Sequence, residues 1–137
     1  MKMRYFWLVF PTAFLLSLGN AIPVVSQAIA ITSSTIELTG SSGGAKKDAS
    51  CAGYIAGAPN HTLEVPADMN LTFSLKAAGQ PALLIRSDTG KEFCVAADAF
   101  SKGEIRVPGR WKKGVYKVFV GDRAQGSFPY KLVVSPN

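Results

Sequence analysis

The chain has 137 residues, of which 47% are apolar and 18% are charged, with two cysteines, one histidine and a formal net charge of +6. This length fits one domain, and the composition excludes a disordered or fibrous chain. The cysteines and the histidine have none of the C-x-x-C or H-x-x-x-H spacings of structural zinc sites. The composition therefore predicts one small globular domain.

Residues 1–30 have the three-part pattern of a secretory signal peptide. Lys2 and Arg4 give a positive start, and an apolar run of 14 residues follows from Tyr5 to Leu18. A more polar stretch then ends in small residues. The apolar run would span about 21 Å as a helix, which is short of a hydrocarbon core of roughly 30 Å. Cleavage is therefore favoured over an uncleaved membrane anchor.

Two positions fit the cleavage. Ala28-Ile29-Ala30 predicts a cut after Ala30, and Ser26-Gln27-Ala28 predicts a cut after Ala28. Without residues 1–30 the chain keeps 13 basic and 9 acidic residues, a net charge of +4. We expect a secreted or periplasmic protein that contacts the membrane only through its leader before cleavage. The mild positive charge predicts attraction to acidic polymers of the cell surface, and we expect no nucleic-acid partner.

Residues 31–49 form a low-complexity segment in which Thr35–Leu38 predicts one short strand and Ser41–Gly44 a flexible linker. From residue 50 to 137, short apolar or alternating runs are separated by Gly, Pro, Asn and Asp, which is typical of strands and turns. No window keeps a helical period. The eight predicted strands are Cys51–Ala56, His61–Val65, Leu71–Lys76, Ala82–Arg86, Glu92–Ala96, Gly103–Val107, Val115–Val120 and Phe128–Val134.

Alternation within these runs predicts how the strands are covered. Apolar residues take every second place in Leu71–Lys76, so we expect one face of this strand to be buried and the other to be wet. Phe119 departs from the alternation of its strand, which predicts a central strand covered on both sides. The residues from 50 to 137 therefore predict an all-β, antiparallel sandwich or barrel. Corners are predicted at Ser87–Gly90, Pro108–Gly109 and Lys113–Gly114, and Gly121-Asp122 is predicted to open a hairpin loop that runs to Gly126.

Cys51 and Cys94 are predicted to form a disulfide, because an exported chain meets an oxidising environment and only one pairing exists. Closing this loop of about 43 residues would stabilise the fold by roughly 4 kcal/mol in the chain-entropy account. The alternative is two free, buried thiols. Neither cysteine is a good candidate nucleophile, because His61 is the only histidine and no other base is implied near the sulfurs.

Several short motifs between Cys51 and Val134 follow one another in a recognisable order. They are Cys51-Ala52-Gly53-Tyr54-Ile55, Pro59-Asn60-His61-Thr62-Leu63, Leu83-Leu84-Ile85, Asp88-Thr89-Gly90, Phe93-Cys94, Gly109-Arg110-Trp111, the run from Gly114 to Gly121, and Tyr130-Lys131-Leu132-Val133-Val134. This order resembles the bacterial pre-peptidase C-terminal (PPC-like) domain. The resemblance covers 84 of the last 107 residues. It implies a jelly-roll-like β-sandwich of an exported bacterial protein, without catalytic activity, that serves binding, adhesion or secretion.

One stretch departs from that family. Many relatives carry adjacent acidic residues just after the second cysteine, whereas here Cys94 is followed by a single carboxylate, displaced to Asp98. Calcium takes six to eight oxygen ligands, usually with several carboxylates. Asp98 would need Glu104 or Asp88 beside it, so we expect neither a bound metal nor another cofactor. Asp98 remains the single candidate calcium ligand, and the alternative is that it caps a turn.

The basic and aromatic residues gather in one stretch of the sequence. They are Arg110, Trp111, Lys112, Lys113, Tyr116 and Lys117. As a candidate ligand surface, this stretch would stack aromatic rings on sugars and attract acidic groups with its cations. In the structural interpretation, which we favour, Trp111 and Tyr116 plug one end of the sandwich while the lysines keep a turn and an edge soluble.

Two classes of function follow. We expect a secreted, non-catalytic binding module that recognises an envelope polysaccharide or a protein through loops and an edge strand. The alternative is a small hydrolytic enzyme, or a protease-associated inhibitor or secretion-assisting domain, on the same sandwich. No catalytic residue is predicted, because His61 lacks a Ser/Asp pairing and the chain has no G-x-S-x-G motif.

Overall fold

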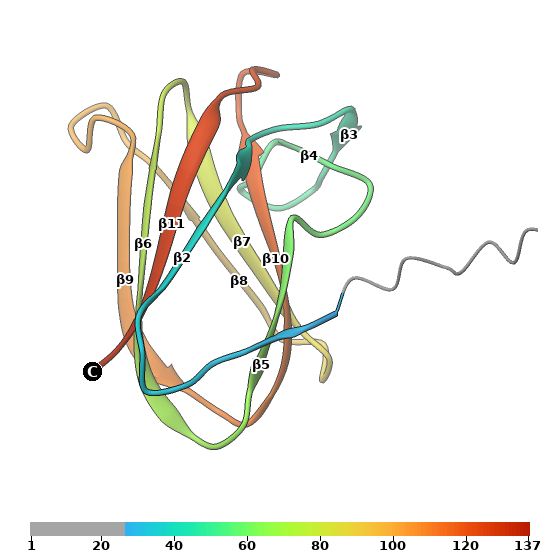
Figure 1. The fold of residues 1–137 in the computed structure, drawn as a ribbon. Coiled ribbons are helices and arrows are strands. Elements are labelled where there is room, and N and C mark those ends of the chain that lie inside the picture. Colours follow the sequence, from blue (N-terminus) through green and yellow to red (C-terminus); the bar gives the residue numbers. More distant parts are fainter. Residues whose placement is uncertain (1–26) are drawn as a thin grey trace, which may run out of the picture.

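The computed structural model describes residues 27–137, and every regular element in that range is a β-strand (Figure 1). The strands are β1 (Ile29–Ala30), β2 (Ile36–Ser41), β3 (Lys46–Lys47), β4 (Tyr54–Ile55), β5 (His61–Val65), β6 (Met69–Ala77), β7 (Pro81–Ser87), β8 (Glu92–Ala96), β9 (Glu104–Trp111), β10 (Gly114–Asp122) and β11 (Pro129–Pro136). Each of the eight predicted runs overlaps one of the strands from β4 to β11. No helix that could cross a membrane is present among residues 27–137.

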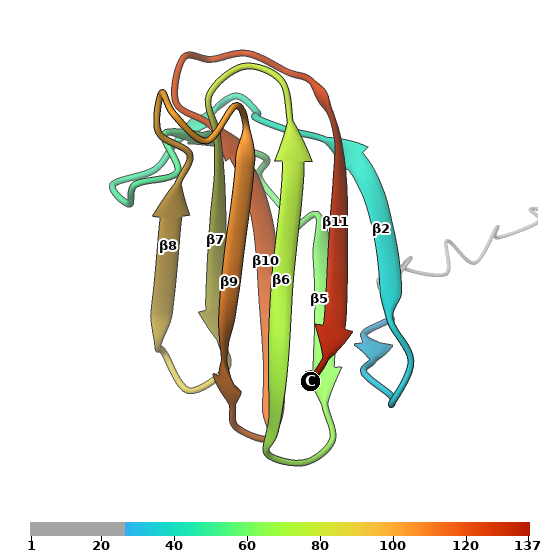
Figure 2. The ribbon, with the colours of Figure 1, turned by 90° about the vertical axis from the view of Figure 1, so that its left-hand side faces the viewer.

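The strands form two sheets that face each other. In the seven-stranded sheet, β10 is central: β7 and then β8 lie on one side, β5 and then β1 on the other, and β4 with β3 continues from its far end. The four-stranded sheet has the order β2-β11-β6-β9. Every pairing is antiparallel except that of β1 with β5. Figure 2 shows the four-stranded sheet in front of β8, β7, β10 and β5. The predicted antiparallel β-sandwich is confirmed.

The space between the two sheets is filled by every second side chain of each strand, the ones that point inward. Leu71, Phe73 and Leu75 on β6 are at most 2% exposed, and Leu132 and Val134 on β11 are fully buried. Successive side chains of a strand point to opposite faces, so these residues share one face of the sheet. The alternation predicted for Leu71–Lys76 therefore places the core correctly.

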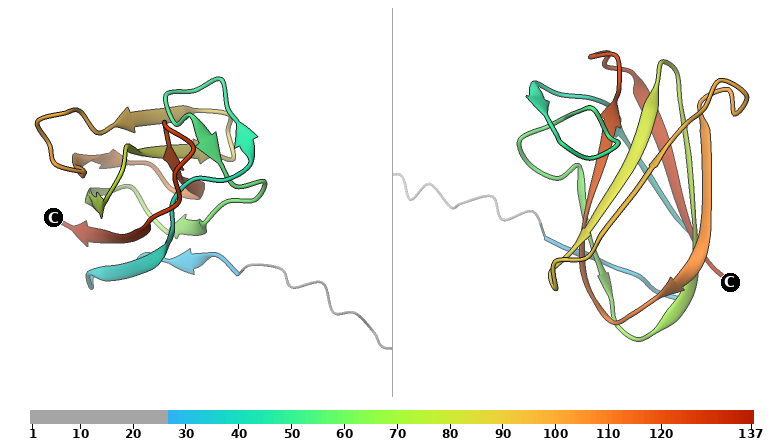
Figure 3. Two further views of the ribbon diagram at one scale, coloured as in Figure 1. Left: turned by 90° about the horizontal axis from the view of Figure 1, so that it is seen from above. Right: turned by 180° about the vertical axis from the view of Figure 1, so that it is seen from behind.

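A second, smaller core lies on the outer face of the seven-stranded sheet. The segment between β2 and β5, residues 42–60, covers this face and is called here the covering segment; it lies at the upper left of the right-hand view in Figure 3. Its Ala52 and Ile55 pack against Leu84 and Phe119. Strands β7 and β10 are thus covered on both sides there, as the position of Phe119 in its strand predicts.

Two links hold the covering segment in place. The predicted disulfide between Cys51 and Cys94 joins it to β8. Arg86 of β7 donates to both carboxylate oxygens of Asp48, at 2.9 Å each, while its guanidinium lies 5.6 Å from the centre of the Phe119 ring. Hydrogen bonds from Ser50 and Arg86 lower the pKa of Asp48 to about 2.

Residues 41–44, expected to be a flexible linker, are instead built into the sandwich. Ser42 is 1% exposed; its N–H donates to the carbonyl of Phe128 at 2.8 Å, and its hydroxyl accepts the N–H of Phe128 at 3.1 Å. Gly43 has a φ of +77°, and a Cβ there would collide with the carbonyl oxygen of Gly126. The small residues of this stretch therefore serve a tight, buried turn. The segment 31–49 thus belongs to the same sandwich: it contains the buried Ile31, which follows β1, and the strands β2 and β3.

The corner expected at Pro108–Gly109 is wrong, because β9 continues through both residues to Trp111. The Ala77 N–H donates to the Gly103 carbonyl at 3.1 Å, so these two opposite residues form a hydrogen-bonded pair. Bonded and non-bonded pairs alternate along two antiparallel strands, and in this register Pro108 belongs to a non-bonded pair. Its missing N–H therefore faces the free edge of β9, where a proline costs no ladder bond. The turn at Ser87–Gly90 is present, with Gly90 at a φ of +87°.

The start of the sandwich distinguishes the two predicted cleavage sites. Ile29 and Ala30 pair with β5, and Ile31, which is 1% exposed, donates its N–H to the Glu64 carbonyl at 2.8 Å. A cut after Ala28 keeps β1, whereas a cut after Ala30 removes it. If the protein is exported and cleaved as the sequence predicts, we expect mass spectrometry to find Ile29 at its N-terminus. A mature chain that begins at Ile31 would contradict this prediction.

Candidate functional site

A groove opens between the free edges of the two sheets, at the end of the sandwich where the β7–β8 and β9–β10 turns lie. Its volume is about 660 Å³. The apolar part of its lining comes from four strands and consists of Ile85, Phe93, Val107, Pro108, Trp111 and Tyr116. A groove of this size and character is in the range of ligand sites.

Aromatic rings form the floor of the groove. The ring of Trp111 lies 4.8 Å from that of Phe73, 6.0 Å from that of Phe93 and 5.2 Å from that of Tyr116, centre to centre. The hydroxyl of Tyr116 donates to the carbonyl of Lys112 at 2.6 Å. These contacts agree with the interpretation of Trp111 and Tyr116 as a plug. Trp111 Nε1 is buried without a hydrogen-bond partner among the described residues.

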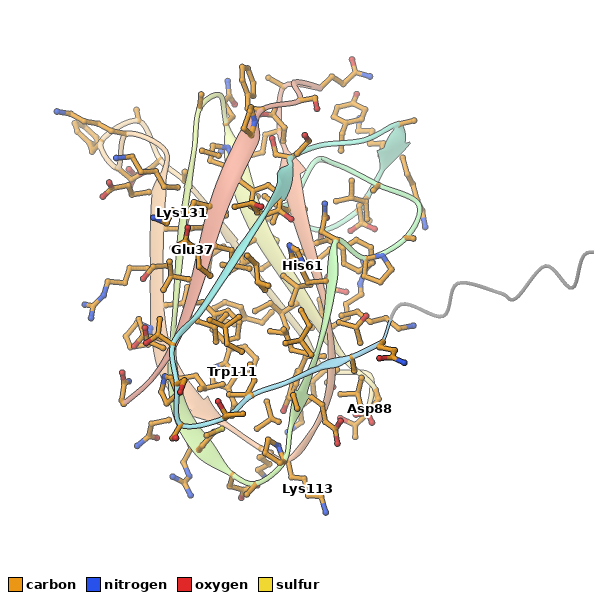
Figure 4. All side chains as sticks on the ribbon, viewed as in Figure 1. Glu37, His61, Asp88, Trp111, Lys113 and Lys131 are labelled. Carbon is orange, nitrogen blue, oxygen red and sulfur yellow. A yellow bond between two sulfur atoms is a disulfide. The ribbon has the colours of Figure 1, made fainter. Side chains whose placement is uncertain are left out.

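Cations outnumber anions around the groove. The charged lining residues are Asp88, Lys91, Glu92, Arg110, Lys112 and Lys113. Glu92 is ion-paired with Arg86 at 3.0 Å, which leaves Asp88 as the other acidic group. The β9–β10 turn is held by the carboxylate of Asp68, which accepts the Lys113 N–H at 2.9 Å. Figure 4 shows Trp111 inside the lower end of the sandwich, with Lys113 below it and Asp88 to its right.

The structure brings five of the six predicted surface residues to this groove and separates the sixth. Lys117 is opposite Arg86 and Thr62 in the register of β10. Because Tyr116 and Val118 point toward the core, Lys117 points away from it, onto the outer face of the seven-stranded sheet. It belongs to another surface.

His61 lies at the β5 edge of the sandwich. Its Nε2 is 2.6 Å from the hydroxyl of Tyr130, and the two rings meet edge to face at 5.9 Å. Burial lowers the pKa of His61, and burial raises the pKa of Tyr130 to about 12. The neighbouring Asn60 accepts the Val120 N–H at 2.9 Å. His61 thus belongs to a network that joins β5 to β11 and β10.

We expect this network to make the protein less stable in mild acid. Because the pKa of His61 is lower in the folded protein, the unfolded chain takes up its proton at a higher pH. The stability contributed by the neutral ring is complete above a pH of about 6.5 and is lost as the pH falls toward the lowered value. Urea unfolding at pH 7.5 and pH 5 measures the loss of stability, which should be larger in the natural protein than in the His61→Gln variant. Equal losses in both proteins would exclude His61 as the source.

Asp98 caps a turn. Its Oδ1 accepts the N–H groups of Phe100 at 2.9 Å and Ser101 at 2.8 Å. It also lines a second cavity of about 460 Å³, beside Lys102 and Arg123. Within residues 27–137, no three side chains of His, Cys, Asp or Glu come together in a way that would hold a metal ion. The calcium candidate thus has a backbone partner for its carboxylate in this structure.

Sequence reasoning missed the role of Asp122, which is fully buried at the end of β10. Its Oδ1 accepts the N–H groups of Ala124 at 2.8 Å and Gly126 at 2.9 Å, and its Oδ2 accepts that of Gln80 at 3.1 Å. One carboxylate therefore closes the β10–β11 loop and ties it to the β6–β7 turn. The signal was the Asp followed by glycine four residues later, a spacing suited to a carboxylate that caps its own loop.

Comparison with known proteins gives one relative by sequence and the fold by structure. No protein family model matches the chain. The uncharacterized protein Synpcc7942_2126 of Synechococcus elongatus is 31% identical over 142 aligned positions, which cover 97% of this chain and 98% of that protein.

Two of the solved structures that are similar to this chain illustrate the fold. The pre-peptidase C-terminal domain of collagenase from Bacillus anthracis matches with a TM-score of 0.52 and 18% identity, over 80% of this chain and 96% of that domain. PliG of Aeromonas hydrophila, a periplasmic inhibitor of g-type lysozyme, has a TM-score of 0.44 and 16% identity, with the same coverage. The likeness to the collagenase domain confirms the PPC-like fold that the sequence motifs imply. The chain belongs to the family of the Synechococcus elongatus protein Synpcc7942_2126 and has a PPC-like fold.

Proposed function

We propose that this protein is an exported, non-catalytic binding module and that its ligand site is the groove between β8 and β9. The leader pattern of residues 1–30 supports export. The disulfide between Cys51 and Cys94 supports it as well, because disulfides persist in oxidising compartments outside the cytosol. The proposal places the protein in the periplasm or outside the cell.

The composition of the groove favours an anionic ligand with apolar parts, and this observation carries the proposal. The walls are aromatic and aliphatic, while Lys91, Arg110, Lys112 and Lys113 stand around them. Burial of apolar ligand atoms supplies affinity, and the cations select for negative charge. Among the described residues, the lining holds neither histidine nor cysteine, and Glu92 is committed to Arg86. These groups suit recognition more than acid–base chemistry.

Charge reversal at the groove tests the proposal. The double variant Lys112→Glu/Lys113→Glu is compared with Lys117→Glu/Lys131→Glu, which changes the net charge equally on the outer faces of the two sheets. The probes are poly-L-glutamate, polygalacturonate and, as a cationic control, poly-L-lysine. We expect the natural protein to bind at least one polyanion at low salt. The groove variant should bind about tenfold more weakly, as two reversed rim charges of roughly 0.7 kcal/mol each imply.

The control variant is expected to keep most of the binding. Equal weakening by both double variants would show a general charge effect and contradict a site at the groove. If the natural protein bound neither of the two polyanions, the proposal of an anionic ligand would be contradicted. All four lysines are exposed, so we expect both double variants to fold, and thermal unfolding checks this.

A further inference from the structure

The free edge of β8 points to the kind of ligand that the groove takes. We infer that an extended peptide binds as an additional strand along β8, with its inward side chains in the groove. This inference rests on the proposed function, because it uses the same site, and it names a polypeptide as the ligand.

The hydrogen bonding of β8 leaves one row of its backbone groups free. Ser87 donates its N–H to the Lys91 carbonyl at 2.8 Å, and Ala97 donates to the Pro81 carbonyl at 3.0 Å. In an antiparallel pair, bonded and non-bonded residues alternate, so Phe93 and Val95 also bond to β7. The N–H and carbonyl groups of Glu92, Cys94 and Ala96 therefore point away from β7. In the part of the chain that the structure describes, β8 has no other strand neighbour.

The uncovered core beside this edge gives an added strand something to bury. Phe93 and Val95 on β8, and Val107 and Trp111 on β9, pack against the main core but are only partly buried. A strand next to β8 would place every second side chain over these four residues. Burial of these peptide side chains would contribute binding free energy, while the backbone hydrogen bonds would fix the register of the peptide.

The other long edges are less suited to a strand. The free edge of β9 contains Pro108, which has no N–H and blocks continuous pairing. The free edge of β2 has the side chain of Asn60 bonded to the Ser41 carbonyl at 3.3 Å and does not adjoin the groove. A polysaccharide would leave the regular row of donors and acceptors on β8 unmatched. The cations near the groove favour a peptide with acidic residues at one end.

Backbone methylation of a peptide separates strand addition from side-chain attraction. The probe is an eight-residue peptide with blocked ends, in which threonine alternates with valine and two aspartates stand at one end. One derivative is N-methylated at its threonines and a second at its valines, so the side chains stay the same. We expect one derivative to bind like the parent and the other at least about tenfold more weakly, because only one set of N–H groups faces β8.

Amide hydrogen exchange by NMR locates the strand. We expect the parent peptide to slow exchange at Glu92, Cys94 and Ala96, and Ala96→Pro, which removes one of these donors, to weaken binding. Lys117→Glu is the control that should leave binding unchanged. Equal binding of both methylated peptides, or protection at Glu37 and Thr39 of β2 instead, would overturn the inference.

The outcome of this experiment is separable from that of the proposed function. If the peptide does not bind but poly-L-glutamate or polygalacturonate still binds in a manner sensitive to Lys112→Glu/Lys113→Glu, strand addition is wrong and the anionic groove stands. If neither the peptide nor either polyanion binds, both proposals are wrong.

Discussion

Replacing Cys51 and Cys94 together by alanine is expected to lower the free energy of unfolding by roughly 4 kcal/mol. The cross-link joins residues 43 positions apart, and in the chain-entropy account a loop of that length restricts the unfolded chain by about this amount. Domains of this size are stable by about 5–15 kcal/mol in total, so the loss is a large share. Urea unfolding of the natural and the double-alanine protein measures the change.

The position of the disulfide makes a second readout possible. It ties the covering segment to β8, and the Asp48–Arg86 pair holds the same segment without a covalent bond. Reduction of the natural protein should reproduce the double-alanine result, whereas Asp48→Ala should cost less because it leaves the chain cross-linked. An unchanged urea midpoint after complete reduction would show that the disulfide does not contribute to stability.

Asp122→Ala is expected to cost about 3 kcal/mol, a loss comparable to that of the disulfide. Three N–H groups, those of Gln80, Ala124 and Gly126, lose their acceptor in this variant. Bonds to a charged group contribute more than neutral ones, and the carboxylate that accepts these three bonds is itself fully buried. Urea unfolding gives the free energy, and amide exchange should show faster opening of the β6–β7 and β10–β11 loops.

Asp122→Asn serves as the matched variant because it keeps the shape of the side chain. Its amide oxygen can accept two of the three bonds, but its NH₂ group then faces the N–H of Gln80. We expect an intermediate loss, with the β6–β7 turn affected more than the β10–β11 loop. A loss within about 0.5 kcal/mol of the natural protein for Asp122→Ala, typical of a surface site, would contradict the role assigned to this carboxylate.

Local patterns predict much of the sandwich because burial repeats along each strand. The period of two in Leu71–Lys76 gives both the strand and its buried face. The irregular place of Phe119 predicts a strand covered on both sides, although the residues that cover it, Ala52 and Ile55, lie far away in the sequence. The cysteine pairing follows from the count of two together with the expected oxidising environment, and it is confirmed.

Other features depend on tertiary neighbours, which a single sequence does not reveal. A stretch such as 41–44 has the composition of a linker, but here its small residues allow close packing against the Phe128 backbone and Gly126. Pro108 indicates a corner unless its strand is known to be an edge. The groove joins two turns and two strand edges. The sequence therefore gives the basic and aromatic residues of β9, β10 and the turn between them, but neither Phe93 nor the separation of Lys117.

The central places of β10 and β11 have a consequence for biogenesis. Each lies in the middle of its sheet, yet they are the last two strands of the chain. Residues 114–136 must therefore arrive before either sheet can close, and the earlier strands have only incomplete sheets to join. If the protein is exported unfolded through a translocation pore, as the proposed function implies, this order prevents either sheet from closing until nearly the whole chain has passed.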